Sequence, residues 1–208
     1  MVRTLEAEDV DWGAGCFVGG SLCLDFCNTQ GGRSKARDNE RLSSYQAVVG
    51  WADAAQGLDV REASALLLMA QAHPEQASRS LEQLRAFRER LHRLFAALAS
   101  NQVPLAADLA SVRAEICAAI AVAELTRHEQ GFSWEVTIEA VGLQTPLARV
   151  ALSAQQLLSS EAVVHVRECE RCSWLFVDRS KNKRRRWCKT ETCGNRARAA
   201  RHYQMTKG

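Results

Sequence analysis

Four cysteines near the C-terminal end restrict what this chain can fold into more than any other feature. They follow the pattern C-x2-C-x15-C-x4-C at positions Cys169, Cys172, Cys188 and Cys193. A C-x2-C pair forms a tight knuckle that directs two thiolates at one ion, and a second pair completes a tetrahedron when the chain returns. We therefore predict one structural Zn²⁺ per chain, in place of the redox pair that C-x2-C alone also allows. Four thiolates fill the coordination shell and leave no position for a catalytic water.

The segment around these cysteines has few other residues that could stabilise a fold. Its large apolar side chains are Trp174, Phe176, Trp187 and little else. A module of about 40 residues with so small a core rarely folds unaided, whereas structural zinc contributes roughly 10–16 kcal/mol in zinc-finger peptides. We therefore expect metal binding to make up the deficit.

The residue types within this segment predict its local structure. Residues 174–177 form a strand-like apolar run, residues 178–183 a polar turn, and residues 185–187 a strand that returns beside the first. Asn195 is expected to cap a closing helix over 196–203. Together these elements predict a small treble-clef-like or ribbon-like zinc module over residues 167–208.

The preceding residues, 1–166, are predicted to form a mostly helical N-terminal domain. Apolar residues recur with the helical period over 44–57, 60–73, 74–98, 105–126 and 145–160. Period-two alternation predicts strands over 22–29, 132–139 and 162–167. The expected fold class is therefore α+β, mainly α with a small β component.

Charge is divided unevenly between these two parts. Residues 167–208 contain 13 Lys and Arg against 4 Asp and Glu, a net charge of +9, whereas residues 1–166 carry a net charge of −6. A basic module suits a polyanion, since phosphate contacts supply most non-specific affinity for nucleic acid. The expected nucleic-acid contacts are Lys181, Lys183, Arg184, Arg185, Arg186, Arg196, Arg198 and Arg201. The alternative is a solvated basic tail that aids solubility.

Other sequence features limit the location and the chemistry of the protein. The first eleven residues lack an apolar stretch, and the longest apolar run near the middle, 65–70, is too short to span a bilayer. We therefore expect a cytoplasmic protein without a membrane partner, in which the eight cysteines are metal ligands and free thiols. Cys23 and Cys27 would lie about 13 Å apart on a strand, too far to share an ion, and are expected to be small buried residues. No catalytic constellation stands out, so we do not expect an enzyme.

Two motifs resemble known families. Trp187-Cys188 followed by Cys193-Gly194-Asn195-Arg196 resembles the CGNR zinc finger, and the run from Cys169 to Asn182 is similar to that family's knuckle and strand. Leu24-Asp25-Phe26-x-Asn28-Thr29 resembles the ABATE domain, the usual N-terminal partner of this finger. Thr190 stands where the family pattern leads us to expect Met, which leaves the metal ligands intact. The resemblance implies a bacterial, stress-linked transcriptional regulator that binds double-stranded DNA.

The resemblance also implies a sensory role for the N-terminal domain. Asp25, Asn28 and Thr29 would then line a pocket for a small-molecule effector, although a turn capped by these side chains is an equal alternative. The domain could equally supply the contacts of a homodimer. Two other functions stay open, which are a protein-interaction adaptor that docks on an acidic partner and an enzyme with its site in the N-terminal domain.

Overall fold

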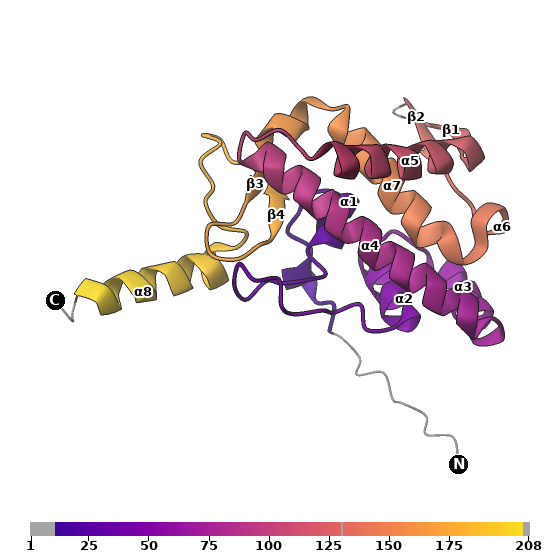
Figure 1. The fold of residues 1–208 in the computed structure, drawn as a ribbon, viewed down its shortest axis with the longest axis horizontal. Helices are drawn as coiled ribbons and strands as arrows, with labels where there is room; N and C mark the ends of the chain where they lie inside the picture. Colours follow the sequence, from indigo (N-terminus) through magenta and orange to yellow (C-terminus); the bar gives the residue numbers. More distant parts are fainter. Residues whose placement is uncertain (1–10, 130, 206–208) are drawn as a thin grey trace, which may run out of the picture.

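The computed structural model describes residues 11–129 and 131–205, without the side chain of Arg201. Within these ranges the chain is mainly helical, with two small antiparallel sheets, as the α+β prediction requires (Figure 1). The helices are α1 Leu22–Cys27, α2 Tyr45–Ala54, α3 Val60–Ala72, α4 Pro74–Ala99, α5 Ala106–Val122, α6 Ile138–Val141, α7 Thr145–Leu158 and α8 Asn195–Met205. The strands are β1 Glu124–His128, β2 Gly131–Glu135, β3 Val166–Glu168 and β4 Leu175–Val177. None of the described helices is both long enough and apolar enough to cross a bilayer.

Helix α4 is the longest element and runs through the middle of the body (Figure 1). Its apolar stripe is buried, and α5, α2 and α3 pack around it. Local signals start the neighbouring helices. The Ser44 side chain accepts a hydrogen bond from the N–H of Ala47 at the start of α2, and Asp59 and Glu62 form a capping box at the start of α3. The predicted helices over 44–57, 60–73, 74–98 and 145–160 are confirmed to within a few residues.

The predicted strand over 22–29 is wrong, because residues Leu22–Cys27 form helix α1. Every residue of α1 except Asp25 is apolar, and periodicity cannot distinguish a strand from a helix in a short run that is buried on nearly all sides. Cys23 and Cys27 are consequently one helical turn apart, not 13 Å apart along a strand. Both are fully buried free thiols, as expected, and burial raises the pKa of Cys23 to about 11.

The chain between α5 and α7 also differs from the prediction. Helix α5 ends at Val122, and residues predicted to continue it form β1, which pairs with β2 in a hairpin that places Leu125 opposite Trp134. The strand predicted over 132–139 ends at Glu135, since Ile138 begins α6. The hairpin lies over α7, and most of its residues are exposed. The burial of apolar residues alone therefore does not explain why β1 and β2 pair. Residues Glu161–His165 form a 3₁₀ helix, which takes up residues 162–165 of the strand predicted over 162–167.

The strand of the zinc module has a different partner from the one predicted. Strand β4 pairs antiparallel with β3, with Val166 opposite Val177, and not with residues 185–187. The backbone of the latter segment instead bonds to the first cysteine knuckle. The inward residues Val166, Leu175 and Val177 belong to the core of the helical body. Strands β3 and β4 therefore share the hydrophobic core of the body, while Phe176 and the four clustered cysteines form a second, smaller cluster. This relationship depends on tertiary packing, which local sequence does not indicate.

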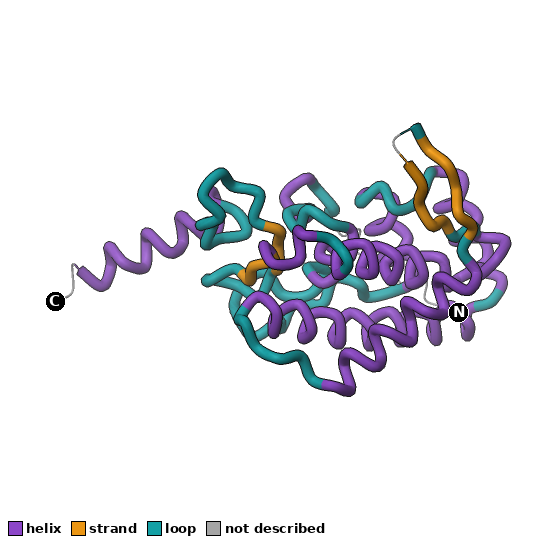
Figure 2. Tube along the Cα trace, turned by 90° about the horizontal axis from the view of Figure 1, so that it is seen from above, coloured by secondary structure: helices purple, strands orange, loops and turns teal. Residues whose placement is uncertain are grey.

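Helix α8 extends away from the rest of the molecule (Figures 1 and 2). None of its side chains that the structure describes is buried. The predicted closing helix is confirmed, but its start differs. Asn195 is already helical, its side-chain amide donates to the carbonyl of Glu191, and a π-helical turn over Thr190–Gly194 leads into the helix in place of an Asn195 cap.

Candidate zinc centre and basic surface

The four predicted zinc ligands lie together and are buried. Their Sγ atoms are all within 4.8 Å of one another. The separations are 3.7 Å for Cys172–Cys188, 3.6 Å for Cys188–Cys193 and 3.7 Å for Cys193–Cys172. A tetrahedron of thiolates about 2.3 Å from a zinc ion has edges of about 3.8 Å. The donor set and its spacing therefore fit one structural zinc ion.

The first pair of cysteines is held in a knuckle that follows β3. The backbone N–H of Cys169 donates to the carbonyl of Trp174 at 2.8 Å, which closes the loop that contains Cys172. The N–H of Glu170 donates to the carbonyl of Arg186 at 3.0 Å. This bond brings the returning chain beside the knuckle and places the second pair of cysteines opposite the first.

The second pair is set by the π-helical turn before α8. Cys193 lies within this turn, and Gly194 follows it with its backbone close to the ring of Trp187. A Cβ atom at Gly194 would lie 3.2 Å from a ring carbon of Trp187, a tight approach. The glycine after the fourth cysteine therefore has a packing role, because it lets the half-buried Trp187 ring close the small core around Phe176 and the ligands.

The buried thiols cannot all ionise without a cation among them. Hydrogen bonds from Cys172 and Cys188 lower the pKa of Cys169. The hydrogen bond with Cys169, together with burial, raises the pKa of Cys172 to about 12. Hydrogen bonds with Cys169 and Cys172, together with burial, also raise the pKa of Cys188. A bound dication reverses this repulsion, since metal ligation stabilises the thiolate form of every ligand.

Arg196, at the start of α8, connects the zinc centre to the helical body. Its Nη2 lies 3.5 Å from the Sγ of Cys193 and 3.5 Å from the carbonyl oxygen of Gly32. Its Nη1 lies 3.3 Å from the carbonyl oxygen of Arg33. Four thiolates around Zn²⁺ carry a net charge of −2, so a guanidinium at this position offsets part of it. Whether Arg196 also contacts nucleic acid stays a prediction.

Two of the other predicted contacts are used inside the module. The guanidinium of Arg185 stacks on Phe176, 4.3 Å from the ring centre, and donates to the carbonyls of Trp187 and Cys188. Arg186 forms a two-pronged ion pair with Glu170, with both nitrogen–oxygen distances at 2.6 Å. These arginines hold the halves of the zinc site together, which the density of positive charge in the sequence did not indicate.

The remaining predicted contacts whose side chains the structure describes are exposed. They are Lys181, Lys183, Arg184 and Arg198. Lys183 Nζ donates to the carbonyl of Asp178, and Arg198 donates to the side-chain oxygen of Asn195. Within the described part of the chain, Lys181 and Arg184 have no hydrogen bond or ion pair. The side chain of Arg201 lies outside the described residues.

The three residues predicted to bind an effector are engaged within the protein. Asp25 accepts a hydrogen bond from the N–H of Gly19 at 2.7 Å, and Thr29 donates to the carbonyl of Phe26 at 2.7 Å. The Asn28 side chain bonds to the backbone of Leu175 in β4. Asn28 and Thr29 are buried. This arrangement favours the structural alternative, in which the motif fixes local backbone and a strand of the zinc module.

Several body residues that hold the zinc module in place were not predicted. Gly31 and Gly32 have positive φ angles of 85° and 98°. A Cβ atom would lie 2.4 Å from Ser173 Oγ at the first position and 2.7 Å from the Trp174 ring at the second. Adjacent glycines in a polar loop are the one signal that could have revealed this close approach. Lys35 adds a hydrogen bond to the carbonyl of Cys169 at 2.6 Å.

Both parts of the chain match family models. Residues 20–161 match the ABATE model, which is described as "Putative stress-induced transcription regulator". Residues 165–205 match the CGNR zinc finger model. No protein of curated function matches the chain. The two matches occur in the order that the sequence motifs indicated.

Proposed function

Because the chain belongs to the ABATE family and ends in a CGNR zinc finger, we propose that it is a transcription regulator whose finger binds double-stranded DNA. In this proposal the helical body is the regulatory part and zinc has a structural role. Neither matched family is enzymatic. The proposal therefore assigns the finger to DNA recognition and assigns no catalytic residue.

The observation that carries this proposal is the outward position of the unpaired cations on the finger. Lys181 and Arg184 are exposed on the loop between β4 and the second pair of cysteines, and α8 projects beyond that loop (Figure 2). Phosphate oxygens are the partners that exposed Lys and Arg side chains bind without displacing an internal contact. A basic loop next to a projecting helix thus supports a nucleic-acid interface.

The dimensions of α8 suit the major groove of B-form DNA. An α-helix with its side chains is about 10–12 Å across, and the major groove is about 12 Å wide. At 1.5 Å per residue, the eleven residues of α8 could lie along the groove for about 16 Å. Arg198 is exposed on this helix, one turn after its first residue. Arginine at such positions recognises guanine through two hydrogen bonds, whereas Arg196 is turned back to the body. We assign the outer face of α8 to base contacts and the loop to phosphate contacts.

The test is the salt dependence of duplex binding by the zinc-loaded chain. Changing Lys181 and Arg184 to Ala together removes two phosphate contacts, so the slope of log K against log salt should become shallower by about 2. The matched control changes Arg61 and Arg113, two exposed cations of the body, to Ala and should leave the slope unchanged. An equal effect of both pairs, or no duplex binding at all, would overturn the proposal. Binding of polyglutamate but not of DNA would favour the adaptor alternative.

A further inference from the structure

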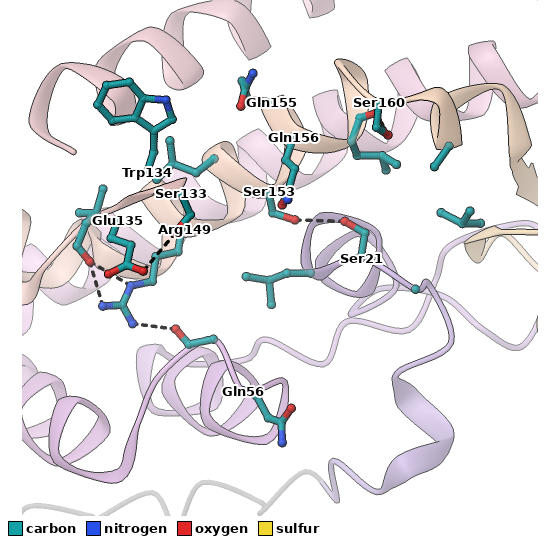
Figure 3. A pocket seen from close by; sticks show the side chains of 18 of the residues that line it. Ser21, Gln56, Ser133, Trp134, Glu135, Arg149, Ser153, Gln155, Gln156 and Ser160 are labelled. Carbon is teal, nitrogen blue, oxygen red and sulfur yellow. Dashed lines mark hydrogen bonds between the residues drawn. The ribbon is translucent and has the colours of Figure 1, made fainter. Parts of the chain in front are cut away.

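A groove runs along α7 between the β1–β2 hairpin and the zinc finger (Figure 3). Its volume is about 920 Å³, within the range of small-molecule sites. The walls come from the hairpin, from residues 20–22 at the start of α1, from residues 56–57, and from Val177 and Arg179 of the finger. Asp25, Asn28 and Thr29 do not line it. The groove is therefore separate from the effector site that the sequence predicted.

One face of α7 forms the floor of this groove. Arg149, Ser153, Gln156 and Ser160 follow one another at intervals of four, three and four residues, so α7 and the residues just after it present them in a row (Figure 3). Trp134 lies above this row, 43% exposed, and Phe132 lies beside it in the hairpin. An aromatic wall thus faces a floor of hydroxyl and amide groups.

The charged group on the floor of the groove is already compensated, whereas Arg179 on the finger wall donates to the carbonyl of Gly20 and has no carboxylate partner among the described residues. The guanidinium of Arg149 donates to both carboxylate oxygens of Glu62, at 2.7 and 2.5 Å, and to the carbonyls of Gly57 and Val136. These bonds occupy all of its N–H donors. On the hairpin, Glu135 Oε1 lies 2.8 Å from Nε2 of His128 and accepts a hydrogen bond from the hydroxyl of Ser133. A charged ligand would find no unpaired opposite charge on the floor and would lose hydration.

We propose that this groove binds an uncharged, ring-containing small molecule that carries hydroxyl or amide groups. The ring would lie against Trp134 and Phe132, and its polar edge would bond to Ser153, Gln156 and Ser160. Aromatic side chains favour ring faces, and neutral donors and acceptors orient a ligand without binding a charge. Nucleosides and glycosides share this chemistry.

The groove also contacts the segment that carries the finger. Val177 donates its backbone N–H to the carbonyl of Gly19 at 2.8 Å, and Arg179 donates to the carbonyl of Gly20 at 2.8 Å. The next residue, Ser21, bonds through its hydroxyl to Ser153 on the floor at 3.1 Å. A ligand that bonds to Ser153 therefore acts on residues 19–21, to which the finger is bonded. Regulation of DNA affinity by this route rests on the proposed function.

The test uses the zinc-loaded full chain and four probes. Adenosine and methyl glucoside are the neutral probes, and adenosine monophosphate and glucose 6-phosphate are their charged counterparts. Saturation-transfer NMR should detect at least one neutral probe at millimolar concentration, and its charged counterpart should bind about ten-fold more weakly. The identity of the bound neutral probe distinguishes the nucleoside from the glycoside. Failure of both neutral probes, or equal binding of the charged ones, would overturn the assignment.

A variant pair locates the site. Gln156→Trp fills the floor from an exposed position and should abolish the signal. Gln76→Trp, at an exposed position on α4, which does not line the groove, should retain it. Equal signals from both variants would place the ligand elsewhere.

Hydrogen exchange tests the connection to the finger without DNA. The bound probe should slow exchange of the Val177 amide by about five-fold or more if the two sites are coupled. An unchanged rate with a bound probe would overturn the coupling. Loss of DNA binding in a separate assay would overturn the proposed function and leave these results unaffected.

Discussion

The side chain of Asn28 and the backbone of Leu175 form two hydrogen bonds with each other across 147 positions of sequence. The amide nitrogen donates to the carbonyl and the amide oxygen accepts from the N–H, both at 2.8 Å. Asn28 thereby acts as a strand partner for the open edge of β4, deep in the protein. A residue of the ABATE body thus satisfies the backbone of the zinc finger.

Replacing Asn28 with Ala should destabilise the whole chain. The change leaves a buried N–H and a buried carbonyl at Leu175 without partners, and we expect a loss of about 2–4 kcal/mol in the free energy of unfolding. Urea denaturation of the zinc-loaded protein measures it. Asn182→Ala, at an exposed asparagine of the finger, is the control and should change stability little. Similar losses in both variants would show that the Asn28–Leu175 bonds do not contribute as proposed.

One zinc ion per chain should depend on Cys188 and not on Cys117. Cys188 is one of the four clustered ligands, whereas Cys117 is an exposed thiol on α5. Elemental analysis should find near-equimolar zinc in the parent chain and in Cys117→Ser, and little in Cys188→Ser. Because Leu175 and Val177 of the finger are part of the body's core, metal loss should also lower the thermal stability of the body. A Cys188→Ser protein with a full complement of zinc contradicts the assignment.

Arg196 and Arg198 should have different effects when each is changed to Ala. Arg196 contacts Cys193 and the loop at Gly32, so its loss should accelerate the transfer of zinc to a chelator. Arg198 is exposed, and its loss should leave zinc release unchanged but weaken or relax base preference by about 1–3 kcal/mol at one position. Chelator kinetics and binding-site selection separate the two effects. Equal zinc-release rates in the two variants would remove Arg196 from the support of the metal site.

Asp25 should make the protein less stable as the pH rises from about 4 to 6. Burial raises the pKa of this carboxyl to about 6 from 3.8, so in that range the folded state binds the proton more tightly than the unfolded state. Its stabilising contribution is complete below pH 4 and is lost as the pH passes 6. Asp25→Asn keeps an oxygen for the N–H of Gly19 and should be more stable at pH 7 by on the order of 1–3 kcal/mol.

Denaturation of both proteins across this pH range, with excess zinc present, measures the difference between them. That difference isolates Asp25 from the acid release of zinc, which affects the two proteins alike. Parallel stability curves would show that Asp25 titrates near its ordinary pKa in the folded protein.

The sequence was sufficient for the longer helices and for the cluster of four cysteines, because both depend on spacing along the chain. The helix that begins at Pro74 repeats its apolar residues over several turns, and the C-x2-C pair brings two thiols together locally. Helix α1 was mistaken for a strand because Cys23 and Cys27 are apolar like their neighbours. Nearly every residue of this short segment is therefore apolar, and the sequence shows neither a helical nor a strand periodicity. In each case the signal was local, and it failed where the segment was too short.

Tertiary relationships could not be predicted in the same way. The pairing of β4 with β3, and the burial of Leu175 in the body, depend on which surfaces meet after folding. The same holds for Arg185, which lies in a basic segment typical of DNA contacts but stacks its guanidinium on the ring of Phe176. Charge density locates a basic segment, whereas the division between structural and exposed cations requires coordinates.

The shared core also has a consequence for the order of synthesis. A ribosome makes Asn28 and the helices of the body long before it makes Leu175, so the body emerges with part of its core uncovered. A message truncated before residue 166 would yield a body that lacks the inward residues of β3 and β4. We expect proteases to remove such a fragment, since incompletely packed chains open more often and are cleaved in the open state. The cell would then accumulate the body only together with its finger.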